Sequence, residues 1–328
     1  MSEATPLFNP VASRRGAVAS PHLLDRQQLR ATRRRLRSLR ERLACGFEPL
    51  VERLARHRQI TSAETLATEI LPLTETVAHL ERCLIDALRP RRVSAAGRPG
   101  WLGGVTLEEQ WRPRGTVLVV GPGNYPLFLA GSQVIQALAA GNRVIWKPAP
   151  GTEEIASCLS TELIAAGFAA SDLEITGTEV NAVYAAIESG VDLAIFTGSS
   201  VHGRALLGAL AERLIPAIVE LSGCDAVWVR PDADFSEAAR LVSYGLLLNH
   251  GRTCLAPRRV FFPEAHRDAF IAALATALSA WKNAREPDAE PLPWPPQATA
   301  AVAAARAAGA STPHGLVEAL PPGVDVLM

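Results

Sequence analysis

The chain has 328 residues, of which 48% are hydrophobic and 20% are charged, as in a globular protein with a full apolar core. Lys and Arg together number 33, as do Asp and Glu, so the zero net charge gives no argument for a nucleic acid, an anionic membrane or an acidic substrate as partner. The five cysteines form no CxxC pair and have no His at metal-ligand spacing, which argues against disulfides or zinc and favours a reducing cytoplasm. No apolar run reaches the ~20 residues that span a bilayer.

The N-terminal region is predicted to be helical. Leucines recur at three- and four-residue spacing and predict a helix from Leu23 to about Arg58. The arginines of "RATRRRLRSLRER" indicate either a nucleic-acid or membrane patch or a solvated helix face, and the absence of interleaved aromatic residues favours the solvated face. Thr61-Ser62 is expected to cap a second helix, with Glu64 in its first turn, that runs to about Leu88.

Strands and helices alternate after the linker "RPRRVSAAGRPGWLGG". The predicted strands are "GTVLVVGPGNYP", "NRVIWKPAP", "DLEITG", "VDLAIFTGSS" and "PAIVELSG", and the helix after the second strand has Thr152 as its expected N-cap. This pattern predicts an α/β fold with a Rossmann-like, doubly wound parallel sheet. We assign residues 1–100 to an N-terminal helical segment and linker, and residues 101–224 to a dinucleotide-binding domain.

Residues 225–328 are expected to form a second α/β domain. Its predicted elements are the strand "DAVWVR", the helix "DFSEAARLVSYGLLLNH", the strand "RRVFF", and the helices "EAHRDAFIAALATALSAWK" and "QATAAVAAARAAGA". The loop "HGRTCLAP" lies between the first helix and the second strand. The sequence stops on the apolar stretch "PPGVDVLM", with no turn or polar tail after it.

Polar residues stand at the ends of the predicted strands, where doubly wound sheets bind ligands. Asn124 follows Gly-Pro-Gly and is either an oxyanion donor or an ordinary turn residue. Lys147 ends the second strand, and "GSSVHG" places exposed N–H groups where a helix begins. Glu220 is either a general base or a loop acceptor. Cys254 is a loop cysteine, and taken alone such a residue is more often inert than reactive.

Five short motifs, which follow one another along the chain, favour the functional interpretation of these residues. The stretches "PGNYP", "KPAP", "FTGSSVHG", "ELSG" and "NHGRTC" resemble the aldehyde dehydrogenase superfamily, whose motifs read P-W-N-F-P, K-P-[SA]-E, F-T-G-S-x-x-x-G, E-L-G-G and N-x-G-Q-x-C. The resemblance implies that Cys254 attacks an aldehyde to give a thiohemiacetal and then, after hydride transfer, a thioester. It also implies that Asn124 and the Cys254 backbone N–H form the oxyanion hole, and that Glu220 activates the hydrolytic water.

The resemblance further implies a nicotinamide cofactor, NAD or NADP, and a small-molecule aldehyde substrate, with no metal, nucleic acid or membrane partner. The implied cofactor-binding residues are Lys147, Gly198, Ser199, Gly203, Pro122 and Leu221. Lys147 would contact the adenosine ribose, and Gly198 with Ser199 the pyrophosphate.

The sequence also departs from the family pattern. Pro150 replaces the glutamate that holds the ribose 2′-hydroxyl, which leaves the choice between NAD and NADP open. Arg252 replaces a glutamine and either favours the thiolate of Cys254 or faces solvent. Ser222 and Gly123 are further replacements, and Cys224 is interpreted as a small apolar residue rather than a second active thiol.

The largest departure is length. Family members continue into an E-x-F-G-P motif and a closing hairpin that builds the dimer, and neither is found here, so the chain resembles a member that stops inside its catalytic domain. The family is usually homo-oligomeric. Two alternatives stay open: a CoA-acylating or thioester-reducing relative that uses the same cysteine, and a non-catalytic nucleotide-binding remnant.

Overall fold

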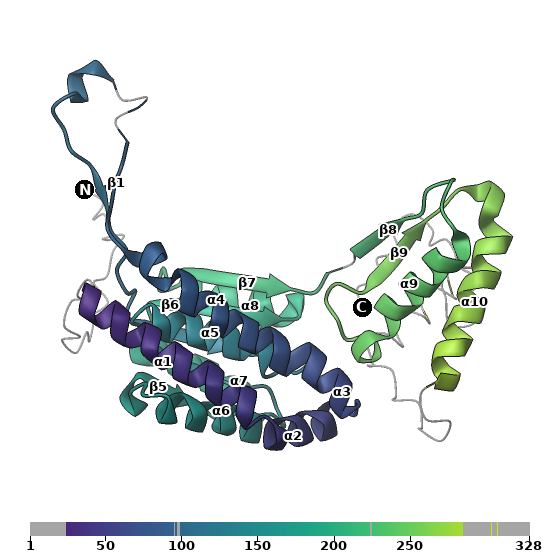
Figure 1. Ribbon diagram of the computed structural model, residues 1–328, viewed down its shortest axis with the longest axis horizontal. Helices are drawn as coiled ribbons and strands as arrows, with labels where there is room; N and C mark the ends of the chain where they lie inside the picture. The colour runs from purple at the N-terminus through teal and green to yellow at the C-terminus, as the bar shows by residue number, and fades with distance from the viewer. Residues whose placement is uncertain are drawn as a thin grey trace, which may run out of the picture. The chain divides into compact units, whose positions relative to one another are not determined.

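The computed structural model describes residues 24–284 apart from 95, 97, 98 and 224, together with residues 303 and 307. The chain divides into two compact units (Figure 1). The sheet unit comprises Met1–Thr197 and Val201–Val219, and the C-terminal unit comprises Gly198–Ser200 and Glu220–Met328. The expected strand at "PPGVDVLM" lies outside the described residues, as does the helix at "QATAAVAAARAAGA" apart from Ala303 and Ala307.

The sheet unit is built on five strands in the order β5-β4-β3-β6-β7. The strands are β3 (Thr116–Val120), β4 (Arg143–Lys147), β5 (Leu173–Ile175), β6 (Leu193–Gly198) and β7 (Ala217–Leu221). The central strand β3 runs parallel to both of its neighbours. All five strands fall within the stretches that the sequence predicts, and the order changes direction on either side of β3, as in a doubly wound fold.

Helices cover both faces of this sheet. On one face lie α5 (Phe128–Ala139) and α6 (Glu153–Ala165), which share an apolar core with Val117 and Val119 of β3. On the other face lie α7 (Val180–Gly190) and α8 (Ser200–Ala211), which pack with Leu118 and Val120. Successive residues of β3 therefore point into opposite cores, which explains why its sequence is continuously apolar. Short η3 (Ala170–Asp172) precedes β5.

The N-terminal helices share the first of these cores. They are α1 (Arg26–Cys45), α2 (Glu48–Arg58), α3 (Ser62–Thr65), the π-helical turn η1 (Leu66–Ile70) and α4 (Leu71–Leu88). The single helix predicted from Leu23 to Arg58 is wrong, because the chain breaks at Gly46 and restarts with a proline in the first turn of α2. The cap at Thr61 is confirmed, since its side chain accepts from the Glu64 N–H.

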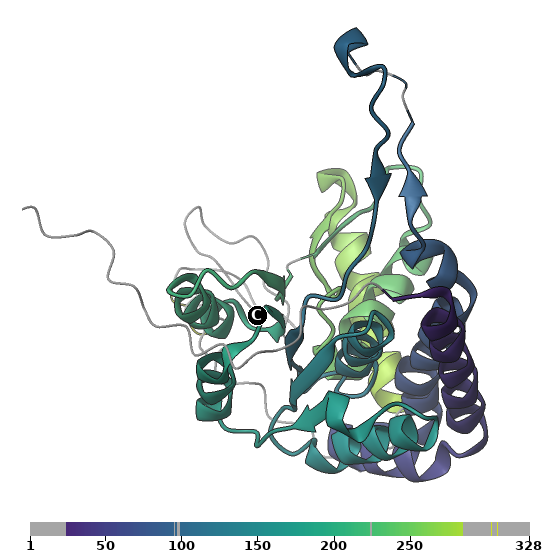
Figure 2. The ribbon, with the colours of Figure 1, turned by 90° about the vertical axis from the view of Figure 1, so that its left-hand side faces the viewer.

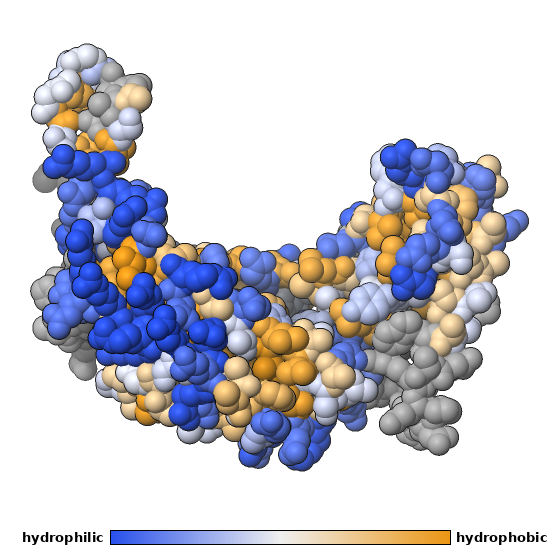
Figure 3. All heavy atoms as spheres, viewed as in Figure 1, coloured by the Kyte–Doolittle hydropathy of each residue, from blue (hydrophilic) through white to orange (hydrophobic). Residues whose placement is uncertain are grey.

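The arginine-rich face of α1 lies over solvent. Hydrophilic side chains cover α1 in the space-filling view (Figure 3), and Arg37 and Arg40 both form ion pairs with Glu81 of α4. Burial raises the pKa of Glu81, but the hydrogen bonds from Arg37 and Arg40 outweigh it and hold that pKa below its ordinary value. This arrangement agrees with the solvated-face interpretation. Arg37 and Arg40 stay in contact with solvent and also form ion pairs that join α1 to α4.

Between α4 and β3 the chain forms an extended arm (Figure 2). The short strands β1 (Arg91–Arg92) and β2 (Glu108–Glu109) pair antiparallel, and the single turn η2 (Gly100–Leu102) lies between them. Trp101 is 81% exposed at this turn. This arm coincides with the segment that the sequence identifies as a Pro/Gly/Arg linker.

Up to residue 284, the described part of the C-terminal unit has a two-stranded parallel sheet and two long helices. Its elements are β8 (Asp225–Trp228), α9 (Phe235–Leu247), η4 (Leu248–Gly251), β9 (Pro257–Phe261), η5 (Glu264–His266) and α10 (Arg267–Ala284). Both strands and the two long helices lie where the sequence predicts them. The buried core within the described residues consists of Val229, Ala239, Val242, Phe270 and Leu274.

Candidate active site

The loop after β3 carries Asn124. The Asn124 side-chain oxygen accepts from the Tyr125 N–H at 3.0 Å, and the amide nitrogen is the donor group of this side chain. Asn124 is half-buried, whereas Tyr125, Pro126 and Leu127 after it are buried. The loop is therefore anchored immediately beyond the residue that the sequence nominates as an oxyanion donor.

The end of β4 buries Lys147. Its side chain is 8% exposed, and burial is the main reason why the pKa of Lys147 is lowered, although Glu179 and Glu153 act in the opposite direction. Pro148 and Ala149 after it are also buried, whereas Pro150 is exposed. Lys147 is therefore a buried lysine at the end of a strand, and not an ordinary exposed surface lysine.

Thr152 occupies the N-cap position of α6, as the sequence predicts. Its side chain makes no cap hydrogen bond to the helix; the hydroxyl instead donates to the Ala149 carbonyl at 2.8 Å. The predicted N-cap position is therefore confirmed, although the side chain makes no cap hydrogen bond and its hydroxyl donates into the turn after Lys147.

The end of β6 leads directly into α8. Gly198 closes the strand, Ser199 links it to the helix, and Gly203 is buried in the first turn of α8. Gln133 of α5 donates to the Thr197 hydroxyl at 2.9 Å, which ties α5 to this strand end. The predicted strand-to-helix turn, with N–H groups available at the start of a helix, is present.

The Cys254 loop has an unusual backbone. Asn249 (φ 51°), His250 (φ 54°) and Gly251 (φ 72°) are three consecutive residues in the left-handed region. Each non-glycine residue in this region costs about 1–2 kcal/mol, and such residues concentrate at functional sites. Asn249 is buried, whereas Arg252 and Cys254 are exposed. The segment before the cysteine therefore has a defined shape that presents the thiol at the surface of its unit.

Arg258 holds this loop from the following strand. Its guanidinium donates to the Gly251 carbonyl at 3.2 Å and to the Thr253 carbonyl at 3.3 Å, and the Thr253 hydroxyl donates to the Leu248 carbonyl. Sequence reasoning missed Arg258. The signal available was weak, since an arginine at the start of a predicted strand carries no indication that it turns back onto the preceding loop.

The turn after β7 lies against the Cys254 loop. A Cβ placed on Gly223 would lie 2.9 Å from the Cys254 carbonyl oxygen, so only glycine permits this approach. Glu220 and Leu221, at the end of β7, are exposed. The structure thus brings the "ELSG" and "NHGRTC" motifs together within one unit. Cys224 lies outside the described residues.

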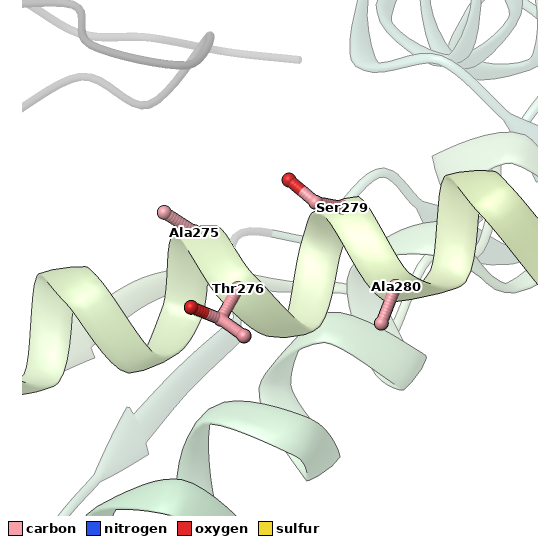
Figure 4. Close-up of a pocket in the computed structure, with 4 residues that line it drawn as sticks. All are labelled: Ala275, Thr276, Ser279 and Ala280. Atoms are coloured by element: carbon pink, nitrogen blue, oxygen red, sulfur yellow. The ribbon is translucent and has the colours of Figure 1, made fainter.

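The predicted site residues are divided between the two units. Asn124, Pro122, Lys147 and Gly203 belong to the sheet unit; Gly198, Ser199, Glu220, Leu221 and Cys254 belong to the C-terminal unit. A hollow beside α10 is lined by small residues (Figure 4), and a second hollow is lined by parts of β8 and α9. Neither contains a predicted site residue, and the Thr276 hydroxyl of the first already donates to the Ala272 carbonyl.

Sequence reasoning also missed a buried ion pair beside the Asn124 loop. Arg58 is 2% exposed and Glu69 is 0% exposed, and their side chains meet at 3.1 Å. Burial is the main cause that raises the pKa of Glu69 to about 7, against the opposing effect of Arg58 and of backbone N–H groups at the start of α5. A glutamate within an otherwise apolar helical stretch was the only signal that could have indicated this pair.

Two kinds of feature do not occur in the part of the chain that the structure describes. No group of three or more His, Cys, Asp or Glu side chains is arranged to hold a metal ion. No helix within those residues is both long enough and apolar enough to cross a membrane.

Sequence comparison places the chain among known proteins. Residues 17–308 match the model of the aldehyde dehydrogenase family. The chain is 32% identical over 266 residues to a 4,4'-diapolycopene aldehyde oxidase of Methylomonas sp, an alignment that covers 77% of this chain and 48% of that protein. It is 31% identical over 239 residues to a probable coniferyl aldehyde dehydrogenase of Pseudomonas aeruginosa, covering 72% and 49%. The chain thus spans about half the length of these relatives.

Solved structures share the fold. A substrate-bound AldH of Staphylococcus aureus superposes with a TM-score of 0.73 at 24% identity, over 86% of this chain and 62% of that one. A Mycobacterium tuberculosis aldehyde dehydrogenase complexed with NAD+ gives a TM-score of 0.68 at 22% identity, over 77% and 50%. At these identities the likeness supports the fold, while the family match rests on the sequence. The chain belongs to the aldehyde dehydrogenase family.

Proposed function

We propose that this chain carries the cofactor-binding and nucleophile-bearing parts of an NAD(P)-dependent aldehyde dehydrogenase, which oxidises an aldehyde to a carboxylic acid. The observation that carries the proposal is the Cys254 loop, which presents an exposed cysteine on a left-handed backbone held by Arg258 and backed by Gly223. In this proposal residues 101–224 form the dinucleotide-binding domain and residues 225–328 belong to the catalytic domain.

The chemistry begins at Cys254. Its thiolate adds to the aldehyde carbon, and the carbonyl oxygen takes up the negative charge of the thiohemiacetal. The Asn124 amide and the Cys254 backbone N–H are the proposed donors to that oxygen. The cofactor, when bound, accepts the hydride that leaves the same carbon as the carbonyl re-forms, which leaves a thioester on Cys254.

Hydrolysis completes the reaction. Glu220 takes a proton from water, the hydroxide adds to the thioester carbon, and the carbon–sulfur bond breaks to release the acid and the thiolate. The exposure of Glu220 at the end of β7 suits a base that must reach water. If Glu220 does not serve in this way, the thioester would pass to another thiol, as in the CoA-acylating alternative.

The residues at the strand ends fit a dinucleotide. The N-terminus of α5, the first helix after the central strand, already receives a carboxylate, because the Phe128 N–H donates to Glu69 at 2.6 Å. A pyrophosphate there would meet a like charge. The start of α8 has no acidic residue in its first turn, so Gly198 and Ser199 are the better pyrophosphate ligands, with Lys147 toward the ribose and Pro122, Gly203 and Leu221 as further contacts.

The cofactor is proposed as NAD or NADP. The exposed Pro150 offers no carboxylate to a ribose 2′-hydroxyl, which removes one reason to exclude a 2′-phosphate. Glu179 and Glu153 nevertheless act on Lys147 and supply negative charge at the end of β4. These two features act in opposite directions, so a direct comparison of the two cofactors is part of the test.

The test is reduction of NAD⁺ or NADP⁺ with a panel of aldehydes that includes apolar polyene and aromatic members, as the relatives' names suggest. Cys254→Ala should abolish turnover, and Cys158→Ala, a half-buried cysteine on α6, should leave it intact. Equal rates for wild type and Cys254→Ala would contradict the assignment of the nucleophile. Cofactor binding with no turnover in any variant would favour the non-catalytic remnant.

A further inference from the structure

A buried ion pair lies beneath the loop that carries Asn124. The Nη1 atom of Arg58 lies 3.1 Å from Glu69 Oε1, and neither side chain reaches solvent. Removing two charges from water costs several kcal/mol per ion, which their attraction offsets only with good geometry and further hydrogen bonds. An apolar pair of similar volume would fill the same space at lower cost, so the charges call for a reason other than packing.

Both partners also make hydrogen bonds to neighbouring groups. Arg58 also donates to the Thr68 hydroxyl at 2.9 Å. Glu69 uses its second oxygen to accept from the Phe128 N–H at 2.6 Å, at the first residue of α5. Glu69 itself lies in the π-helical turn η1, and such turns often mark functional positions within longer helices.

The pair contacts the Asn124 loop at two points. The Arg58 guanidinium carbon lies 4.6 Å from the centroid of the Tyr125 ring, within the range of a cation–π interaction. Tyr125 in turn donates its backbone N–H to the side-chain oxygen of Asn124. Together with the bond from Phe128 to Glu69, these contacts hold the loop on both sides of Pro126.

We propose that Arg58 and Glu69 are positioning residues for Asn124, acting through the Tyr125 ring and the first turn of α5. This inference rests on the proposed role of Asn124 as an oxyanion donor. The pair touches neither substrate nor cofactor. It fixes the backbone from which the Asn124 amide is presented, and a displacement of about 1 Å in such a group lowers a rate by up to about a hundredfold.

The test compares two reactions of Cys254 in the 328-residue chain without cofactor. Acylation by p-nitrophenyl acetate passes through an oxyanion, whereas alkylation by iodoacetamide does not. Both rates are measured at the Cys254 peptide by mass spectrometry. The ratio of the acylation rate to the alkylation rate is then compared with the same ratio for the thiol of glutathione. The ratio responds to oxyanion stabilisation and cancels changes in the exposure or ionisation of the thiol.

The variants are Glu69→Gln and Arg58→Lys, with Asn124→Ala as benchmark and Glu81→Gln as matched control. Glu81 of α4 is also a glutamate paired with arginine, but its ion pairs are with Arg37 and Arg40 of α1 and not with the Asn124 loop. We expect Asn124→Ala to lower the ratio about a hundredfold, Glu69→Gln and Arg58→Lys about tenfold or more, and Glu81→Gln less than twofold.

The outcomes separate the two claims. If Asn124→Ala lowers the ratio while Glu69→Gln and Arg58→Lys leave it unchanged, the positioning role is overturned and the oxyanion role stands. If the wild-type ratio does not exceed that of glutathione, or Asn124→Ala leaves it unchanged, the oxyanion role fails first and the positioning role with it. Loss of the thermal unfolding transition in both pair variants would overturn the proposal in favour of a purely structural pair.

Discussion

The two units of this chain hold their motif residues in different ways. In the sheet unit, Lys147 ends a strand that is buried apart from its first residue, and Asn124 precedes three buried residues. In the C-terminal unit, Glu220 and Cys254 are exposed, and the sheet that its described residues form has two strands, with Trp228 81% exposed. A large core fixes the first set, whereas hydrogen bonds within a loop fix the second.

This difference shows two physical routes to a defined site. A strand end within a close-packed sheet inherits its position from many small apolar contacts. The Cys254 loop relies instead on the left-handed residues at Asn249 and His250 and on the hydrogen bonds of Arg258. We therefore expect the sheet unit to resist local opening better than the C-terminal unit.

The largest expected effect is a loss of stability, for which we compare one core leucine from each unit. Leu73 of α4 is fully buried against α5, and Leu274 of α10 is 5% exposed in the smaller core. Leu73→Ala should lower the free energy of unfolding by about 4 kcal/mol, and Leu274→Ala by about 2 kcal/mol, since a smaller core relaxes more easily around the cavity. Urea unfolding followed by circular dichroism measures both.

Hydrogen exchange locates each effect. Leu73→Ala should speed amide exchange in α4 and α5, and Leu274→Ala in α9 and α10 only. If Leu274→Ala opened α5 as readily as α9, the two units would share one cooperative core and the comparison between them would be wrong.

The second prediction concerns the charge buried in the sheet unit. Because burial raises the pKa of Glu69 to about 7 from 4.5, the native chain keeps a proton between these pH values that the unfolded chain has lost. The contribution of Glu69 to stability is therefore fully present below pH 4.5 and is lost as the pH rises through about 7. Relative to Glu69→Gln, the wild-type protein should lose up to about 3 kcal/mol over this interval.

Glu81→Gln gives the opposite sign and serves as control. The native pKa of Glu81 is lowered, so its contribution is present above the ordinary pKa and is lost as the pH falls. Urea midpoints at pH 8 and pH 5 for wild type and both variants test Glu69, and a further midpoint at about pH 3 tests Glu81, whose lowered pKa places its titration below pH 4.5. Parallel pH profiles for wild type and Glu69→Gln would show that Glu69 does not titrate in this range.

The sequence was sufficient for the parts of the fold that depend on periodicity. The five strands of the sheet, their alternation with helices and the cap at Thr61 follow from local patterns, and the structure contains them. The break at Gly46 was missed because the leucine spacing continues across it. Thr152 occupies the expected N-cap position, but the contact of its hydroxyl with the Ala149 carbonyl carries no local signal in the sequence.

The supporting contacts of the site could not be predicted from the sequence. Glu69 meets Phe128 across 59 residues of chain, and neither position carries a local signal of that contact. Arg258 lies in a strand, and its side chain turns back to donate to the carbonyls of Gly251 and Thr253. The sequence pattern of that strand predicts the strand but not this contact. Motifs identify the residues that react, whereas the residues that hold them depend on tertiary placement.

The smallest expected effects come from glycines inside helices. A Cβ at Gly131 of α5 would lie 2.8 Å from the end of the Leu159 side chain, whereas a Cβ at Gly245 of α9 would lie 2.9 Å from the ring of Pro257. A leucine end can rotate but a proline ring cannot. Gly131→Ala should therefore cost about 1 kcal/mol and Gly245→Ala about 2 kcal/mol, after the gain in helix propensity. Gly208→Ala, with open space around it, should stabilise by about 0.5–1 kcal/mol.

Gly245→Ala also tests what fixes the Cys254 loop. Pro257 begins β9 directly after that loop, so pushing its ring away from α9 should change the rate at which iodoacetamide alkylates Cys254. Gly131→Ala, in the other unit, should leave that rate unchanged. Equal alkylation rates in both variants would mean that the loop keeps its shape without the α9 contact, and that the hydrogen bonds of Arg258 are sufficient to present the cysteine.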